Sequence, residues 1–329
     1  MFKKILFLSF LIPIMADKMS FSQFIKTHDK HYNDTELVHR LSIYQSNIAS
    51  IEAHNNDISN NWKKGINQFT DLTADEFKNL VSRPLKNHNH NHTHDGKHKP
   101  SPSPTPAPQP SPQPIIPIPS EWDWTTQGAV TAIKDQGQCG SCWAFGTAEA
   151  IESAWFLKNK QLLTLSEQQL VDCDKTDAGC NGGLPDNAFQ YVISNKGLCS
   201  ESSYPYKGKN GKCQTCQPVA SITSFVDVNP TEQDLMQAVA RQPVTVAIEA
   251  DQVLFQSYSQ GVLTAACGTN LDHAVVVVGY GTLNGIPYWK VRNSWGTTWG
   301  MDGYILLARN VSQNGGQCGI LMQASYPVV

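Results

Sequence analysis

Histidine is nearly absent from the larger, C-terminal part of this sequence. The chain has ten histidines, and nine of them lie at or before His98. If the rest of the chain uses an imidazole for catalysis, that imidazole must belong to His273. A basic excess is absent as well, since residues 118–329 contain 12 Lys and Arg against 18 Asp and Glu, a net charge of about −6. This balance gives no reason to expect binding to nucleic acid or to an anionic membrane.

Long apolar runs are also absent after the N-terminus. The one apolar stretch runs from Ile5 to Met15, follows Lys3-Lys4 and ends at Ala16. A charged start, a short apolar core and a small residue predict a signal peptide at residues 1–16, with a signal anchor as the alternative. The stretch is too short to span a membrane without its charged flank. We therefore expect a soluble mature protein that is not bound to a membrane.

Cysteine is absent before Cys139, and all nine cysteines lie in the C-terminal part. In a chain with a signal peptide, this distribution predicts an oxidising compartment and disulfide bonds. Three glycosylation sequons begin at Asn33, Asn91 and Asn310 and suit the same route. We expect the secretory pathway, ending in a lysosome or vacuole or outside the cell. The acidic C-terminal part is compatible with an acidic vesicle.

The run Gln136-Gly-Gln-Cys-Gly-Ser-Cys-Trp-Ala-Phe145 contains the groups that thiol catalysis requires. Cys142 begins a helical pattern that continues through Ala144, Ala148, Ile151 and Trp155. The positive end of a helix dipole favours a thiolate at such a position. The Gln136 side-chain amide and the Cys142 backbone N–H are candidate donors to a developing oxyanion.

His273 precedes a short apolar run, Ala274 to Val278, that predicts a buried strand. A second strand is expected at Tyr288 to Asn293, because Asn284-Gly285 between the two runs is a hairpin signal. Folding about this turn places residue 273 opposite residue 296. A bulge or a diagonal neighbour would then bring the Asn293 amide to the His273 ring. Cys142, His273 and Asn293 are thus candidates for nucleophile, base and orienting group.

Other interpretations of these residues remain open from the sequence. Cys139 and Cys142 form a Cys-x-x-Cys pair, which also occurs in redox sites and as half of a zinc site. The redox alternative lacks its βαβ context, and only Cys213 and Cys216 resemble a second zinc-binding pair. A single histidine before an apolar strand is usually structural. The combination of all these features favours the catalytic interpretation.

These motifs resemble those of the papain family of cysteine proteases, in its cathepsin L-like branch, over about residues 18–329. The resemblance implies a cysteine endopeptidase of α+β class. Its helical half and its antiparallel, β-barrel-like half would enclose the active site. Cys142 matches the nucleophile, His273 the general base, Asn293 the orienting amide and Gln136 the oxyanion donor. Trp295 matches the tryptophan that shields the Asn–His hydrogen bond. Neither a cofactor nor a metal ion is expected.

The resemblance also implies a substrate cleft. Gly183 matches the residue that presents its backbone to an extended peptide. The pocket for the side chain two residues before the cut bond would be lined by Leu184, Pro185, Ala247, Leu271, Ala274 and Gln323. Asp272 and Trp295 complete the substrate-binding set. Because five of the six pocket residues are apolar, we expect a hydrophobic preference.

Disulfide pairing is likewise implied by the resemblance. It selects Cys139–Cys180, Cys173–Cys213 and Cys267–Cys318. Cys199 and Cys216 fall outside the common pattern, and we expect them to form a fourth disulfide.

Residues 17–83 predict a helical prosegment. Helical spacing relates Glu36, Arg40, Ile43, Tyr44, Asn47, Ile51 and Asn55. This spacing resembles the first motif of cathepsin L-like propeptides, and the run from Gly65 to Asp71 resembles the second. The implication is an intramolecular inhibitor that lies along the cleft of a monomeric zymogen.

Residues 84–117 form a His- and Pro-rich linker, in which the proline density favours extended polyproline II. Its histidines suit metal chelation, acid sensing or simple low-complexity sequence. The peptidase domain is expected at residues 118–329. Polypeptides are the expected substrates, with hydrolysis through an acyl-thioester on Cys142. The alternatives are a peptide ligase and a catalytically silent peptide-binding homologue.

Overall fold

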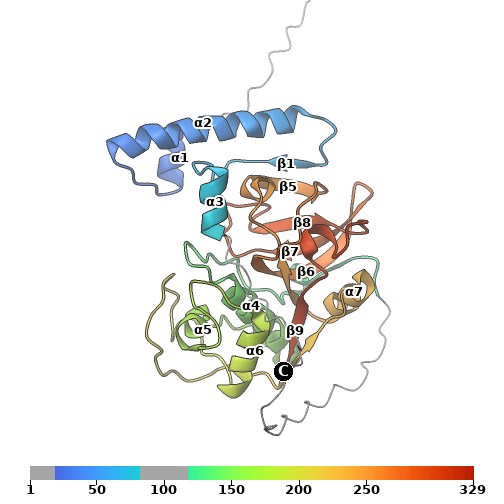
Figure 1. Cartoon of the computed structure of the whole chain (residues 1–329). Coiled ribbons are helices and arrows are strands. Elements are labelled where there is room, and N and C mark those ends of the chain that lie inside the picture. The colour runs from blue at the N-terminus through green and yellow to red at the C-terminus, as the bar shows by residue number, and fades with distance from the viewer. Residues whose placement is uncertain (1–18, 82–117) are drawn as a thin grey trace, which may run out of the picture.

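The computed structural model describes residues 19–81 and 118–329. The expected signal peptide, the His- and Pro-rich linker and the Asn91 sequon lie outside these residues. The prosegment contains α1 (Phe21–Thr27), α2 (Asp34–Asn56), β1 (Trp62–Lys64) and α3 (Ala74–Val81). In Figure 1 these elements, in blue to cyan, lie over the sheet on the side of β5 (Tyr258–Leu263). No helix in the described ranges is long and apolar enough to cross a membrane.

The helical half follows β2 (Trp122–Asp123) and the short 3-10 helix η1 (Trp124–Gln127). It consists of α4 (Cys142–Asn159), α5 (Glu167–Cys173) and α6 (Pro185–Ser194), which lie together in Figure 1. Local sequence signals mark the starts of two of these helices. The Ser166 side chain accepts from the Gln169 N–H as the N-cap of α5, and Pro185 opens α6. The first 13 residues of α4, Cys142 to Ala154, are all buried, and its apolar side chains belong to the core of this half.

The second half is built on a sheet of nine strands within the described residues. Its remaining elements are β3 (Ser224–Asp227), α7 (Glu232–Arg241), β4 (Val244–Ile248), α8 (Val253–Gln256), β6 (His273–Leu283), β7 (Ile286–Arg292), β8 (Tyr304–Ala308), η2 (Gln317–Gly319) and β9 (Ala324–Val328). The order along the sheet is β1-β5-β8-β7-β6-β4-β9-β3, with β2 paired to β6. Every pair is antiparallel except β5 with β8, which is parallel. The antiparallel expectation is wrong at this pair, because the β6–β7 hairpin is inserted between the two strands in sequence.

The β6–β7 hairpin turns at Asn284-Gly285, as predicted, and both residues have positive φ (51° and 80°). Pairing from Leu283↔Ile286 to Gly279↔Lys290 follows the expected register. A bulge between Val277 and Gly279 then shifts the register, so that Val276 pairs with Arg292. The next residue after β7 is Asn293, and the bulge moves it one position closer to His273.

The prosegment is bound to the sheet half through its two predicted motifs. Asn47 donates to the carbonyls of Thr70 and Leu72 at 2.8 and 2.9 Å, so it joins α2 to the second motif. Asn67 in turn donates to the Gln256 carbonyl of the peptidase half at 2.7 Å. Phe69, Phe77, Trp62 and Val81 of the prosegment belong to the same hydrophobic core as the sheet. The second motif therefore contacts the enzyme directly and the first motif holds the second, while apolar side chains of β1 and α3 add to the attachment.

All four expected disulfides are present, including Cys199–Cys216 with a Cα–Cα distance of 6.2 Å. Cys199 is fully buried in a small cluster with Cys173 and Tyr204. This cluster lies beside the helical core and fixes the loop that runs from residue 199 to 216. The two cysteines that the family resemblance leaves unassigned thus close this loop.

We expect the double variant Cys199→Ala/Cys216→Ala to lose about 3 kcal/mol of unfolding free energy, the chain-entropy value for a loop of this length. The measurement is urea unfolding of the proform, with Cys142→Ala in both proteins so that neither digests itself. An unchanged midpoint would show that this bond adds nothing to the stability of the loop.

Candidate active site

Cys142 lies at the first position of α4, where the helix places its N-terminal N–H groups around the thiol. The side chain is buried, with 1% of its surface exposed. Ala274, the residue after His273 on β6, contributes a backbone hydrogen bond to the sulfur. The Thr245 hydroxyl of β4 donates to the Gly146 carbonyl at 2.8 Å and joins α4 to the sheet. The nucleophile from one half therefore meets the start of β6 from the other.

The His273 ring is fixed by Asn293. Asn293 Oδ1 lies 2.7 Å from His273 Nε2 and also accepts from the Ser294 backbone N–H at 2.8 Å. An oxygen that faces both groups can only accept, so Nε2 carries the ring proton. The other nitrogen, Nδ1, is buried and has no hydrogen-bond partner among the described residues. The neutral ring thus keeps its unprotonated nitrogen available for a proton.

Trp295 covers this pair. Its indole stacks on the His273 ring with centroids 4.8 Å apart and an interplanar angle of 30°. His273, Asn293 and Trp295 are all at most 2% exposed. An apolar cover excludes water from the His–Asn hydrogen bond and so strengthens it. This placement agrees with the shielding role that the family resemblance implies for Trp295.

Burial decides the charge of the pair in this form of the protein. It raises the pKa of the Cys142 thiol to about 11, and the charge of Asp272 acts in the same direction. Burial also lowers the pKa of His273 to about 4, although the bond to Asn293 opposes this. The helix dipole alone predicts a thiolate, but burial in the proform acts against it and favours the neutral thiol and the neutral imidazole.

Ser294, the residue that follows Asn293, holds Gln136 in place through two hydrogen bonds. The Gln136 backbone N–H donates to the Ser294 carbonyl at 2.9 Å, and the Ser294 hydroxyl donates to Gln136 Oε1 at 2.6 Å. This second bond fixes the orientation of the side-chain amide, with Oε1 facing Ser294 and Nε2 facing away from it. Nε2 donates one hydrogen to the Cys139 carbonyl at 3.0 Å and keeps a second hydrogen. Ser294 is not among the residues predicted from the sequence, although it lies between Asn293 and Trp295 in the same run.

The expected substrate pocket residues come from four segments. Ala247 of β4 pairs with Ala274 of β6, and its N–H donates to the Gln323 carbonyl at 2.9 Å. Leu184 and Pro185 form the start of α6, which is joined to β9 by a 2.6 Å bond from Ser325 to Asp186. The Leu271 side chain lies against Gly319, and a Cβ added to Gly319 would be only 2.6 Å from the Leu271 side chain.

Two further residues of the expected substrate set are held by specific contacts. A Cβ at residue 183 would lie 2.5 Å from the Trp143 side chain and 2.7 Å from the Asp177 side chain. Only glycine therefore allows the backbone at this position to pack so closely against these two residues. The Asp272 carboxylate accepts from the Ala250 N–H at 2.8 Å and is 3% exposed. Its side chain therefore joins the segment after β4 to the residue that precedes His273.

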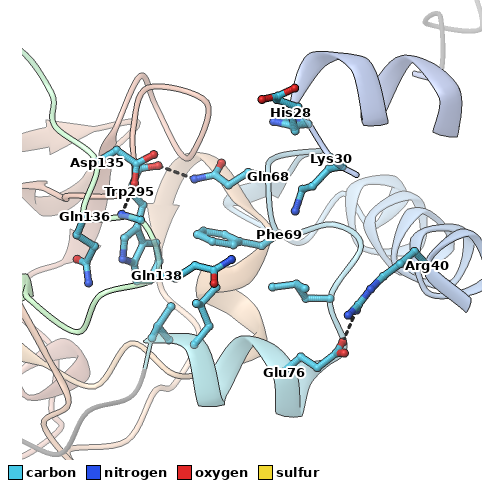
Figure 2. A pocket seen from close by; sticks show the side chains of 15 residues that line it. His28, Lys30, Arg40, Gln68, Phe69, Glu76, Asp135, Gln136, Gln138 and Trp295 are labelled. Carbon is cyan, nitrogen blue, oxygen red and sulfur yellow. Dashed lines mark hydrogen bonds and ion pairs between the residues drawn. The ribbon is translucent and has the colours of Figure 1, made fainter. Parts of the chain in front are cut away.

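The prosegment packs directly on Trp295, the residue that covers His273. Phe69 and Phe77 make edge contacts with Trp295 at centroid distances of 5.5 and 5.7 Å. Gln68 donates to the Trp295 carbonyl, as Figure 2 shows. A cavity of about 420 Å³ lies here between the two parts, with Gln136 and Gln138 on the enzyme side and Arg40 and Glu76 on the prosegment side. The prosegment thus covers one side of the site.

A buried ionic cluster joins the two halves behind the catalytic residues, and no local sequence signal indicates it. Arg292, the last residue of β7, pairs with Glu149 of α4 at 3.2 Å. Lys134 pairs with Glu152 at 2.6 Å and with Glu167. Burial raises the pKa of Glu149 to about 7 despite its partner. Removing one partner of such a pair leaves an uncompensated buried charge.

The redox and zinc alternatives for the Cys-x-x-Cys pairs are wrong. Cys139 is joined to Cys180, and Cys213 and Cys216 are each in a disulfide. All nine cysteines lie in the described ranges, and Cys142 remains as the free thiol. Residues 19–81 and 118–329 contain no group of three His, Cys, Asp or Glu side chains placed to hold a metal ion.

Comparisons with known proteins agree with this geometry. Residues 118–328 match the family model described as papain family cysteine protease, and residues 21–77 match the cathepsin propeptide inhibitor domain. The chain is 45% identical over 299 residues to cysteine proteinase COT44 of Brassica napus, covering 88% of each protein. It is 45% identical over 297 residues to germination-specific cysteine protease 1 of Arabidopsis thaliana, covering 88% of this chain and 77% of that protein.

Solved proforms have the same fold. The ragweed pollen cysteine protease Amb a 11 in its proform superposes with a TM-score of 0.83 at 37% identity, covering 94% of this chain and 84% of the other. Digestive procathepsin L 3 of Tenebrio molitor gives 0.80 at 36% identity, covering 94% and 93%. The free Cys142, the Asn-bound His273, the propeptide motifs and these matches together show that the chain belongs to the papain family of cysteine proteases, as a propeptide-containing zymogen of a cysteine-type endopeptidase.

Proposed function

We propose that Cys142, His273, Asn293 and Gln136 perform peptide-bond hydrolysis through an acyl-thioester. The observation that supports this assignment best is the proton arrangement of His273, whose Nε2–H is held by Asn293 while Nδ1 is unpartnered. In the mature enzyme the Cys142 proton passes to this nitrogen. The resulting thiolate attacks the substrate carbonyl, and the imidazolium then protonates the leaving amine. Water, activated by neutral His273, hydrolyses the thioester and regenerates the thiol.

The oxyanion of each tetrahedral intermediate would receive two hydrogen bonds. One comes from the Cys142 backbone N–H at the start of α4, and the other from the second hydrogen of Gln136 Nε2. Both donors are fixed before substrate binds, because Ser294 holds the Gln136 amide and the helix holds the backbone. Such preorganised donors are usually the largest single contribution to acyl-transfer catalysis.

The protein is proposed to enter the secretory pathway, as its signal-like N-terminus and its four disulfides favour. One relative bears the name KDEL-tailed cysteine endopeptidase CEP2, from Arabidopsis thaliana. A lysosome, a vacuole or the extracellular space is the proposed destination, with glycans at Asn33 and Asn310, which are both exposed. The mature enzyme is proposed to act as a monomer.

The preference two residues before the cut bond is proposed to be hydrophobic. Leu184, Pro185, Ala247, Leu271 and Ala274 would surround such a side chain, with the neutral Gln323 at the base. Burial of a leucine or phenylalanine contributes about 25 cal/mol for each Å² removed from water. A guanidinium would find no carboxylate partner among these six residues.

We expect the mature enzyme to cleave a Phe-Arg reporter far better than an Arg-Arg reporter, measured as kcat/KM. Gln323→Glu should raise the Arg-Arg rate, most clearly above the pH at which the new carboxylate ionises. Met322→Glu is the matched control, because Met322 is the adjacent residue and is 49% exposed. Equal kcat/KM for the two reporters in the wild type would disprove the pocket assignment.

A further inference from the structure

One tyrosine hydroxyl lies between the two segments that supply the oxyanion donors. Tyr206 Oη is 2.8 Å from the backbone carbonyl oxygen of Gln136 and 2.7 Å from the Ser141 hydroxyl. Gln136 is the side-chain donor, and Ser141 directly precedes Cys142, the backbone donor. Tyr206 lies 64 or more positions away in sequence, so no local pattern indicates this contact.

The direction of these two hydrogen bonds follows from their chemistry. The Gln136 carbonyl can only accept, so the Tyr206 hydroxyl donates to it. The Tyr206 proton is then used, and the Ser141 hydroxyl must donate to Tyr206 Oη. Burial raises the pKa of Tyr206 to about 12, so the hydroxyl keeps its proton at any pH where the enzyme works. The result is a chain of hydrogen bonds from Ser141 through Tyr206 to Gln136.

We propose that Tyr206 is a positioning residue that holds the Gln136 segment and the start of α4 at the spacing that the oxyanion requires. This inference rests on the proposed oxyanion roles of Gln136 and Cys142. A tetrahedral oxyanion needs both donors at 2.7–3.1 Å, so a small drift of either segment weakens the stabilisation. Tyr206 restrains both segments with a single atom.

Tyr206 is itself held by contacts of its backbone and of its ring. Its backbone N–H donates to Glu201 Oε1 at 2.8 Å, and the next N–H, of Lys207, donates to the buried Gln168 at 2.7 Å. Its ring makes an edge contact with Phe145, one turn after Cys142 on α4, at a centroid distance of 4.9 Å. The Cys199–Cys216 disulfide closes the loop that contains it. A support this rigid suits a positioning role.

The test is Tyr206→Phe, which removes the hydroxyl and keeps the ring against Phe145. Each full-length proform is converted by pepsin, and active sites are counted with an irreversible thiol label. We expect kcat/KM to fall about tenfold. This decrease is smaller than the about 10²–10³-fold decrease that removal of a whole oxyanion donor causes. The inhibition constant of a peptide aldehyde should rise by a similar factor, because its hemithioacetal places an oxygen in the same site. The rate of Cys142 alkylation by iodoacetamide, which forms no oxyanion, should stay unchanged.

Tyr204→Phe is the matched control from the same loop. The Tyr204 hydroxyl donates to Asp172 at 2.9 Å and accepts from the Gln214 N–H, away from both oxyanion donors. Its loss should lower the Tm while kcat/KM and aldehyde inhibition stay at the wild-type values. If Tyr206→Phe fails to fold, Ser141→Ala removes the other end of the same hydrogen-bond chain and should give the same pattern.

A double variant separates this inference from the proposed function. In a Gln136→Ala background, Tyr206→Phe should cost less than it does in the wild type, because one of the donors it positions is already gone. Wild-type kcat/KM in Tyr206→Phe would overturn the inference, as would equal losses in hydrolysis, aldehyde binding and alkylation. The proposed oxyanion role of Gln136 would fail separately, if Gln136→Ala alone had no effect, and the proposed hydrolysis would fail if Cys142→Ala kept its activity.

Discussion

Replacing Cys142 with alanine should abolish peptide hydrolysis while the proform still folds. Cys142 is the free thiol of the chain, and its proposed proton acceptor is the unpartnered Nδ1 of His273. Alanine is a good helix former and removes only one sulfur atom from the start of α4. The variant should therefore accumulate as an intact zymogen with a normal far-UV spectrum and no turnover. Residual activity after purification away from any wild-type enzyme would disprove the mechanism.

The same thiol provides a sharper measurement in the wild type. Burial in the proform raises the pKa of Cys142 and lowers that of His273, so it favours the neutral form of both groups. Only the thiolate reacts quickly with iodoacetamide. Alkylation of Cys142 should thus be slow in the proform and fast after the prosegment is removed, with the Cys142→Ala proform as the blank. Equal rates in the two forms would contradict a protective role for the prosegment.

The helical half could be predicted closely because its signals are local. Each signal acts within one turn of the chain, as for the Ser166 cap, the Pro185 start and the glycine after α6. The hairpin was also predictable, since Asn284-Gly285 sets its turn type. Its exact pairing was not, because the bulge between Val277 and Gly279 depends on contacts with neighbouring strands. That bulge is what places Asn293 at the imidazole.

Contacts between distant segments account for what the sequence analysis missed. Ser294 was within reach, since it lies between two residues already identified, but its role needs Gln136 from 158 positions earlier. Arg292 and Glu149 are charged residues on a strand and a helix, and such residues usually face solvent. Only the three-dimensional structure shows that both are buried and paired. The parallel β5–β8 pair is likewise a product of topology.

Replacing Gln136 with alanine should lower kcat by about 10²–10³ and change KM little, because the lost hydrogen bond forms mainly in the transition state. Gln136→Glu makes the test stricter. It keeps an acceptor for the Ser294 hydroxyl but has no N–H donor, and its charge would repel the oxyanion, so its loss should be at least as large. Gln138→Ala is the matched control, since Gln138 is exposed and lies two positions along the same loop. The measurement is steady-state hydrolysis of the Phe-Arg reporter by pepsin-matured enzymes at equal titrated active sites. A loss confined to KM, or an equal loss in Gln138→Ala, would assign Gln136 to substrate binding or to folding, and Cys142 would then stabilise the oxyanion through its backbone alone.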